Sequence, residues 1–206
     1  MPRPVMTNTE VQDVREQICD QALTLFTEKG VENVGLRAIG AELGITATAL
    51  YRYFPDGRDE ILAAVRARAF KQFADVTEEA FQSDGAPLDR FRAMGRAHVA
   101  FARERTATYH MMFDFSQSGE FPDLREQAKR ARHILFSAIE ELARSENMDR
   151  DYQVLAHVSW AAMHGAVQLE TSNQLKFGVN IEQLMGGLCD MLFARNEYET
   201  NPLGEN

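Results

Sequence analysis

The feature that most constrains this chain is a pair of short helical segments joined by a glycine turn at residues 36–54. Ile39 and Leu43 are four residues apart, so they would line one face of a first helix. Gly40 has no side chain and would let a neighbouring backbone come close. Gly44 suits a left-handed turn residue just after a helix end. The pattern predicts two short helices that meet at a sharp angle.

The second segment has a cap, a buried stripe and a polar face. Thr46 is a good N-cap, and Leu50 and Phe54 would form the buried stripe. Thr48, Tyr51 and Arg52 would face outward. Their hydroxyls and guanidinium suit hydrogen bonds to base edges and phosphates. Such a unit commonly places its second helix in the major groove of DNA. The alternative is an ordinary helical hairpin inside an all-helical core.

Helical periodicity covers most of the chain and strand signals are almost absent, so the expected fold class is all-α with about nine helices. Caps and breakers are expected at Thr9 with Gln12, Gly30, Thr46, Asp56, Ser83–Gly85, Pro87, Thr106, Pro122, Asp149, and Asn180 with Gln183. The two long helices that follow the short pair would span residues 58–82 and 122–146. The last two would span residues 149–175 and 180–195.

A chain of 206 residues is long enough for one large domain or two small ones. We expect a helix-turn-helix DNA-binding domain at residues 1–56. A helical body at residues 57–206 would follow, with a linker helix that begins at about residue 58. The tail from Glu197 is polar and would contribute little to a core.

The net charge of −9 is unusual for a nucleic-acid binder, but its distribution is uneven. No acidic residue occurs between Glu42 and Asp56. Five basic residues lie in or just after that window: Arg52, Arg58, Arg66, Arg68 and Lys71. The acidity of the remainder would limit non-specific DNA affinity.

The protein is expected to be cytoplasmic. Residues 1–10 lack the apolar core of a signal peptide, and no apolar run is long enough to span a bilayer. Cys19 and Cys189 lie among apolar helical residues, so we expect buried free thiols in a reducing compartment.

Two parts of the sequence resemble a known family. Residues 30–62 resemble the DNA-binding head of the TetR family of bacterial transcriptional regulators. The most specific stretch is Gly44-Ile45-Thr46 followed by Leu50-Tyr51-Arg52-Tyr53-Phe54, which is similar to the family's Gly-Val-Ser and Tyr-x-His/Tyr-Phe pattern. The body contains two stretches that resemble a TetR C-terminal class named for its Trp-His-Gly residues. They are Tyr109-His110-Met111-Met112-Phe113 and Trp160-x-x-x-His164-Gly165.

The resemblance implies a homodimer whose heads enter successive major grooves of a near-palindromic operator. The residues expected to contact DNA are Arg37, Thr46, Ala47, Thr48, Tyr51, Arg52, Tyr53 and Arg58. Two departures from the family pattern bear on phosphate contacts. Gly35 stands where the family usually has a capping Ser or Thr. The usual Lys after the Phe-Pro turn appears as Arg58, displaced by the extra Gly57.

The resemblance also implies a small effector in the body. The candidate effector-binding residues combine apolar walls with a few polar tips, which indicates an apolar or aromatic ligand. They are Phe91, Met94, His98, Phe101, Tyr109, Met112, Phe113, Phe136, Trp160 and His164. The alternative is that most of these side chains are simply core. The expected dimer interface is a four-helix contact made by the last two helices, with Gly165, Leu184, Gly187, Leu188 and Met191.

No cofactor or metal is expected, because the histidines lack HExxH or i, i+4 spacing and no cysteine pair accompanies them. A Gly-x-Ser-x-Gly motif is also absent, so a hydrolase is disfavoured. Two functions stay open: a ligand-responsive repressor, and a DNA-bound TetR-fold protein that acts mainly by binding a protein partner.

Overall fold

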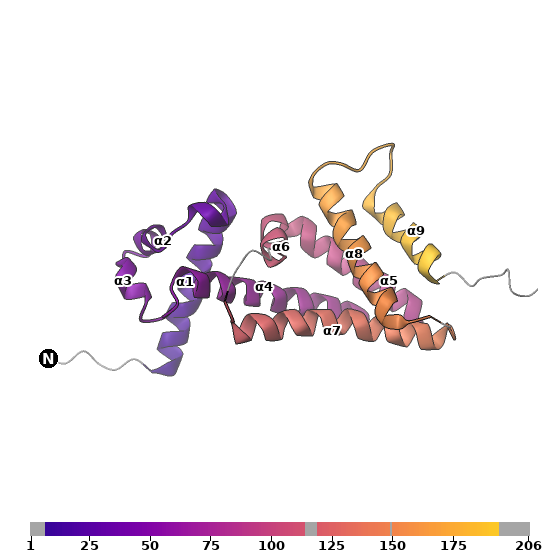
Figure 1. The fold of residues 1–206 in the computed structure, drawn as a ribbon, viewed down its shortest axis with the longest axis horizontal. Helices are drawn as coiled ribbons and strands as arrows, with labels where there is room; N and C mark the ends of the chain where they lie inside the picture. Colours follow the sequence, from indigo (N-terminus) through magenta and orange to yellow (C-terminus); the bar gives the residue numbers. More distant parts are fainter. Residues whose placement is uncertain (1–6, 114–118, 149, 194–206) are drawn as a thin grey trace, which may run out of the picture. The chain divides into compact units, whose positions relative to one another are not determined.

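The computed structural model describes residues 7–113, 119–148 and 150–193, and within these ranges the regular secondary structure is helical throughout (Figure 1). This confirms the all-α prediction with about nine helices. The elements are α1 (Asn8–Lys29), the 3₁₀ helix η1 (Val31–Asn33), α2 (Leu36–Glu42), α3 (Ala47–Leu50), α4 (Arg58–Phe81), α5 (Pro87–Glu104), α6 (Thr106–Met112), α7 (Pro122–Ser145), α8 (Tyr152–Thr171) and α9 (Ile181–Phe193).

Contacts divide the chain into two compact units. Unit 1 comprises Met1–Val76 and Phe101–His133, and unit 2 comprises Thr77–Ala100 and Ile134–Asn206. Helices α4, α5 and α7 therefore contribute residues to both. This grouping by contacts differs from the expected division after residue 56. That division separates a DNA-binding part from a ligand-binding part, and it stays a prediction.

The core of unit 1 is formed by α1, α2, α3 and the first half of α4, with one residue of α6. Its centre is fully buried at Ile18, Ile39, Leu50 and Phe54. Met111 of α6 joins the same cluster. Because α3 is only one turn long, its orientation depends on this packing rather than on its own helical propensity.

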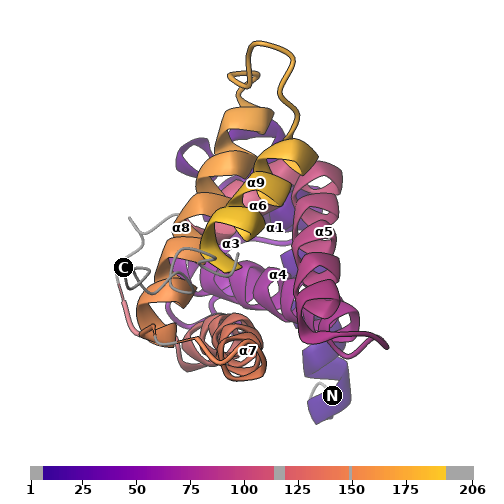
Figure 2. The same ribbon diagram turned by 90° about the vertical axis from the view of Figure 1, so that its right-hand side faces the viewer.

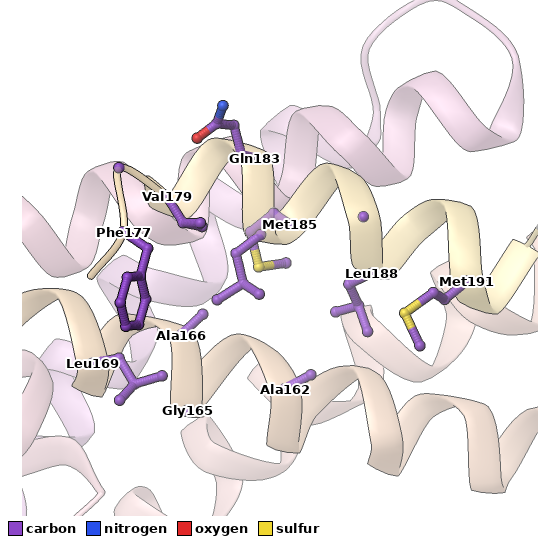
Figure 3. A pocket seen from close by; sticks show the side chains of 13 residues that line it. Ala162, Gly165, Ala166, Leu169, Phe177, Val179, Gln183, Met185, Leu188 and Met191 are labelled. Carbon is purple, nitrogen blue, oxygen red and sulfur yellow. The ribbon is translucent and has the colours of Figure 1, made fainter. Parts of the chain in front are cut away.

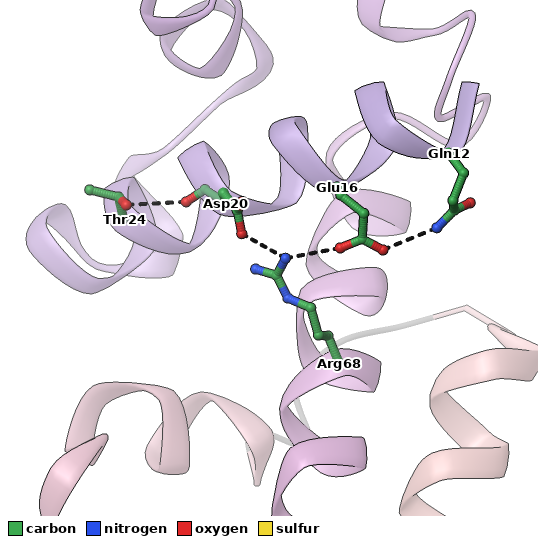
Figure 4. Close-up of polar contacts among 5 residues, drawn as sticks. All are labelled: Gln12, Glu16, Asp20, Thr24 and Arg68. Atoms are coloured by element: carbon green, nitrogen blue, oxygen red, sulfur yellow. Dashed lines mark hydrogen bonds and ion pairs between the residues drawn. The ribbon is translucent and has the colours of Figure 1, made fainter. Parts of the chain in front are cut away.

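Charged side chains attach α1 to α4 on the outside of this core (Figure 4). Arg68 of α4 reaches two carboxylates of α1: its Nη1 lies 3.1 Å from Glu16 Oε2 and 2.7 Å from Asp20 Oδ1. Gln12 donates a hydrogen bond to Glu16 at 3.0 Å. Arg68 therefore bridges two successive turns of α1.

Two long helices end in a hydrogen-bonded turn with a left-handed asparagine just after the helix. Asn147 after α7 and Asn173 after α8 have φ of 50° and 54°. After α8, Asn173 N–H donates to Glu170 O at 2.9 Å and Gln174 N–H to Leu169 O at 2.6 Å. This is a Schellman motif, and it corrects the expected helix end near residue 175 to Thr171.

The structure corrects two further expected caps. The capping box that opens α1 pairs Thr7 with Glu10, not Thr9 with Gln12. Thr106 is the first residue of α6 rather than its cap, because its hydroxyl donates back to Ala102 O at 3.0 Å.

The cap of α8 is Asp151, whose carboxylate accepts from Gln153 N at 2.8 Å, instead of Asp149, which lies outside the described residues. The other expected boundaries are confirmed at Gly30, Thr46, Pro87, Pro122 and Asn180 with Gln183.

In unit 2, α8 and α9 run side by side (Figure 2). Leu155 and Ala156 of α8 and Ile181 and Cys189 of α9 are buried. Arg150, just before α8, donates to Leu192 O at the end of α9 at 3.1 Å. Cys19 and Cys189 are both buried free thiols, as expected. In the described part of the chain, no helix has both the length and the hydrophobicity that a bilayer span requires.

Candidate nucleic-acid interface and effector-binding residues

The turn between α2 and α3 is built by two glycines with different tasks. Gly44 has φ of 66° and forms the Schellman turn in which Ile45 N–H donates to Gly40 O at 2.9 Å. Gly40 is the point of close approach: a Cβ there would lie 2.6 Å from Ile45 O. The expected sharp glycine turn is therefore confirmed, and it fixes the angle between the two helices.

Helix α3 begins as the sequence predicted and presents a polar face. The Thr46 hydroxyl accepts a hydrogen bond from Ala49 N–H at 3.2 Å. The fully buried Leu50 and Phe54 hold the opposite face in the core. The side chains of Thr46, Thr48, Tyr51, Arg52 and, from α2, Arg37 are exposed, whereas Ala47 and Tyr53 are half-buried. Five of the eight expected DNA contacts thus lie on the surface of one small unit.

The Tyr51 ring packs next to Gly57. Gly57 is buried and has φ of 65°, and a Cβ there would lie 3.0 Å from the Tyr51 ring and 3.3 Å from Leu36 Cδ1. The extra residue that separates this sequence from the family pattern therefore seats the Tyr51 ring. Its own sequence context gave no sign of this contact.

Arg58 is bound to the backbone of the segment before α2. Its Nε donates to Val34 O at 2.7 Å and its Nη2 to Val31 O at 2.5 Å, while Nη1 lies 3.3 Å from Asp59 Oδ1. The guanidinium thus fastens the loop before α2 to the start of α4. A phosphate contact by Arg58 would have to use its remaining N–H groups and stays a prediction, so Arg58 is not part of the proposed DNA-binding set.

The sequence reading missed Arg15, which lies on α1. Its guanidinium lies 4.0 Å from the centre of the Phe54 ring, donates to Tyr53 O and forms an ion pair with Glu60 at 3.3 Å. The partners are 38 to 45 residues away along the chain. No local pattern could have indicated this contact.

The candidate effector-binding residues fall into two groups, one in each unit. In unit 1, Phe101, Tyr109 and Phe113 join a cluster of rings with Phe70 and Phe73 of α4. The ring centres are 4.9 Å apart for Tyr109 and Phe113, and 5.4 Å apart for Phe73 and Phe101. Met112 is fully buried in the same unit. The two α4 phenylalanines were not among the expected residues.

In unit 2, the candidates include a buried histidine. His98 is only 5% exposed, and burial, with a contribution from nearby His164, lowers its pKa to about 3. It is therefore neutral at physiological pH. Phe91 and Met94 are also buried, with the Phe91 ring 5.3 Å from Phe193. Phe136, Trp160 and His164 are half-buried.

The α8–α9 groove is an open apolar hollow of about 720 Å³ (Figure 3). All of its lining residues are uncharged: Ala162, Gly165, Ala166, Leu169, Phe177, Gly178, Val179, Gln183, Leu184, Met185, Gly187, Leu188 and Met191. The set contains all five residues expected at the dimer interface. Among the described residues, a Cβ at Gly165 or Gly187 would meet nothing within 4 Å, so neither glycine is required there by close packing.

In the described part of the chain, no three His, Cys, Asp or Glu side chains are grouped so that they could hold a metal ion. Burial raises the pKa of the Cys19 thiol to about 11, which keeps it protonated.

Comparison with known proteins connects both ends of the chain with one family. A family model described as "Bacterial regulatory proteins, tetR family" matches residues 18–65. A second, described as "Tetracyclin repressor-like, C-terminal domain", matches residues 91–192. The HTH-type transcriptional repressor KstR of Mycolicibacterium smegmatis is 30% identical over 112 residues, 52% of this chain and 54% of KstR. The match thus spans about half the length of that relative.

Solved structures share the fold over most of the chain. A protein of unknown function from Rhodococcus sp. RHA1 has a TM-score of 0.76 at 20% identity, covering 87% of this chain and 93% of that one. The TetR family regulator PfmR of Thermus thermophilus has a TM-score of 0.65 at 18% identity, covering 86% and 97%. With a helix-turn-helix at one end, an all-helical body and both halves matched, the chain belongs to the TetR family of bacterial transcriptional regulators.

Proposed function

We propose that the protein is a homodimeric, ligand-responsive transcriptional repressor that acts by binding and not by catalysis. One observation carries the proposal: α3 and the turn after it, which contain no acidic residue, hold polar side chains outward while Leu50 and Phe54 are buried in the core. The proposed DNA-binding set is Arg37, Thr46, Ala47, Thr48, Tyr51, Arg52 and Tyr53. The hydroxyls suit base edges and phosphates, and the two arginines suit phosphates. We place this activity in the cytoplasm.

The proposed partner DNA is a near-palindromic operator. A two-fold dimer of helix-turn-helix proteins reads half-sites spaced by about one helical turn. The test is selection of bound duplexes from a random pool with the full-length protein. Enrichment of a palindrome supports the proposal, and a pool without any enriched sequence contradicts it.

We propose the α8–α9 groove as the site of dimer contact. Its rim exposes large apolar side chains, among them Met191 at 80% and Phe177 at 103%. Isologous dimers bury such faces against their own copy. The remaining tail, residues 194–206, carries four charged residues and is a poor match for an uncharged groove. If the groove instead binds a different protein, the purified chain should be a monomer, and that result would support the partner-binding alternative.

We propose that the effector is a small, largely apolar or aromatic molecule. The candidate residues supply rings and thioethers with a few hydrogen-bonding tips, and none of them is Lys or Arg. A phosphate ester would be poorly matched. We also assign the body to the Trp-His-Gly class, on Trp160, His164 and Gly165.

Release of DNA requires that the effector favour the conformation that cannot bind the operator. A ligand that binds both states equally shifts nothing. The test is a thermal-shift screen with apolar and aromatic compounds, followed by competition against the selected operator. A compound that raises the melting temperature and weakens operator binding supports the proposal. Hits that stabilise the protein without changing operator affinity contradict it.

A further inference from the structure

The turn that follows α3 is held by a side chain from another helix. Arg15 of α1 places its guanidinium 4.0 Å from the centre of the buried Phe54 ring and donates to the carbonyl of Tyr53. Carbonyls at a helix end lack partners within the helix, so a cation that donates to one is stabilising there. This carbonyl belongs to a residue of the proposed DNA-binding set.

The same arginine is connected to the turn that follows. Both Nη atoms of Arg15 lie 3.3 Å from Glu60 Oε1. The other oxygen, Glu60 Oε2, accepts from Asp56 N–H at 3.0 Å. One carboxylate therefore joins Arg15 to the backbone after α3. The side chains of Arg15 and Glu60 are 28% and 20% exposed, so water screens the ion pair only in part.

We propose that Arg15 is a positioning residue for DNA recognition: with Glu60 it holds residues 51–56 in the orientation that presents Tyr51 and Arg52. This inference rests on the proposed DNA-binding function. Because α3 is a single helical turn, its own backbone hydrogen bonds hold it only weakly without contacts from other elements. Arg15 supplies such contacts from α1, without touching DNA itself.

Arg15→Met tests this, because it removes the guanidinium and leaves an apolar stem on Phe54. The matched control is Arg68→Met. Arg68 also bridges α1 and α4 through ion pairs, but these join it to Glu16 and Asp20 of α1. Both variants should lose similar thermal stability. Only Arg15→Met should weaken binding to the selected operator, by about tenfold.

Salt dependence separates positioning from direct contact. Loss of an arginine that touches a phosphate lowers the slope of log affinity against log salt by about one and weakens all duplexes alike. Arg15→Met should leave the slope unchanged and reduce the ratio of operator to scrambled-duplex affinity. Arg15→Lys should also be impaired, because an ammonium lacks the planar fork that reaches Tyr53 and Glu60 together. A reduced slope, full activity of Arg15→Lys, or equal loss in Arg68→Met would overturn the inference.

Hydrogen exchange gives a readout that does not need DNA. The amide of Phe54 donates to Leu50 O and that of Gly57 to Phe54 O, each at 2.9 Å. Arg15→Met should lower the protection of these two amides more than Arg68→Met does. If the wild-type protein enriches no duplex, the proposed DNA-binding function is contradicted. Unchanged amide protection in Arg15→Met would contradict the positioning role of Arg15, whatever the result with DNA.

Discussion

At the scale of single residues, Tyr51 is both exposed and rigidly supported. Its side chain is 51% exposed, and the buried Gly57 leaves room for its ring. A supported aromatic ring loses little entropy on binding, and its hydroxyl is free to turn toward an acceptor. A substitution at Tyr51 should therefore remove a DNA contact while the protein stays folded.

We expect Tyr51→Ala to weaken operator binding by about 1–2 kcal/mol, roughly tenfold, with the melting temperature almost unchanged. Tyr51→Phe keeps the ring on Gly57 and removes only the hydroxyl. It should reproduce most of the loss if the hydroxyl makes the contact. Fluorescence anisotropy with the selected duplex measures both variants. Wild-type affinity in Tyr51→Ala would exclude this residue from the interface.

The buried His98 makes stability depend on pH. Burial holds its pKa at about 3 in the folded protein, against 6.5 for an ordinary histidine. Below about pH 6.5 the unfolded chain takes up a proton that the folded protein does not, so the free energy of unfolding falls as pH falls toward 3. Above pH 6.5 this contribution is fully present.

The expected measurement is a chemical denaturation series between about pH 7 and pH 4.5, above the range in which most carboxylates titrate. His98→Gln should flatten the pH dependence in this window. His133→Gln, at an exposed histidine, should leave the dependence almost as in the wild type. An unaltered slope in His98→Gln would mean that His98 is not the group responsible.

At the scale of elements, the helix-turn-helix depends on one backbone contact. The α2 end and the α3 start approach each other at Gly40, where Ile45 O occupies the space of a side chain. The carbonyl belongs to the backbone, so it cannot turn away as a flexible side chain would. The angle between α2 and α3, and with it the direction of the polar face, is thus set by the absence of a Cβ.

Gly40→Ala should lower the free energy of unfolding by about 1–3 kcal/mol, because the added methyl meets backbone at 2.6 Å. Gly95→Ala is the matched control inside α5. A Cβ there would meet nothing within 4 Å, so alanine should stabilise the helix by about 0.5–1 kcal/mol. Urea denaturation measures both changes. Equal effects in the two variants would refute the close approach.

At the scale of the whole molecule, the α8–α9 groove is an apolar surface in a chain with a net charge of −9. Met191 and Leu184 on α9 and Leu169 on α8 are exposed. Phe177, fully exposed, has φ of 60°, a conformation that costs a bulky residue energy in the isolated chain. Contact with a second copy of the chain would bury these side chains.

We expect sedimentation to show a wild-type dimer at micromolar concentration. Leu188→Glu would bury an unpaired charge at the centre of the groove and should yield monomers or aggregates. Phe177→Ala should weaken the dimer by a smaller amount. The matched control is Gln168→Glu, an exposed position on α8 outside the groove lining, which should stay dimeric. A monomeric wild type would contradict the proposed interface.

The sequence by itself determined what is local. Glycine at residue 44, threonine at residue 46 and asparagine with glutamine at residues 180 and 183 act on backbone groups within a few residues, so their effects could be predicted. Helical periodicity likewise predicted which residues of α2 and α3 are buried. The cap of α1 is equally local, because Thr7 and Glu10 each accept a hydrogen bond from the other's backbone amide, although the sequence prediction chose Thr9 with Gln12.

Only the tertiary structure decided what depends on contacts between distant segments. Arg15 and Glu60 are 45 residues apart, and Gly57 meets Leu36 of α2. The partition of the candidate effector-binding residues between two units, and the engagement of Arg58 by Val31 and Val34 carbonyls, arise in the same way. The physical reason is that such contacts follow from the packing of whole helices, which no short stretch of sequence specifies.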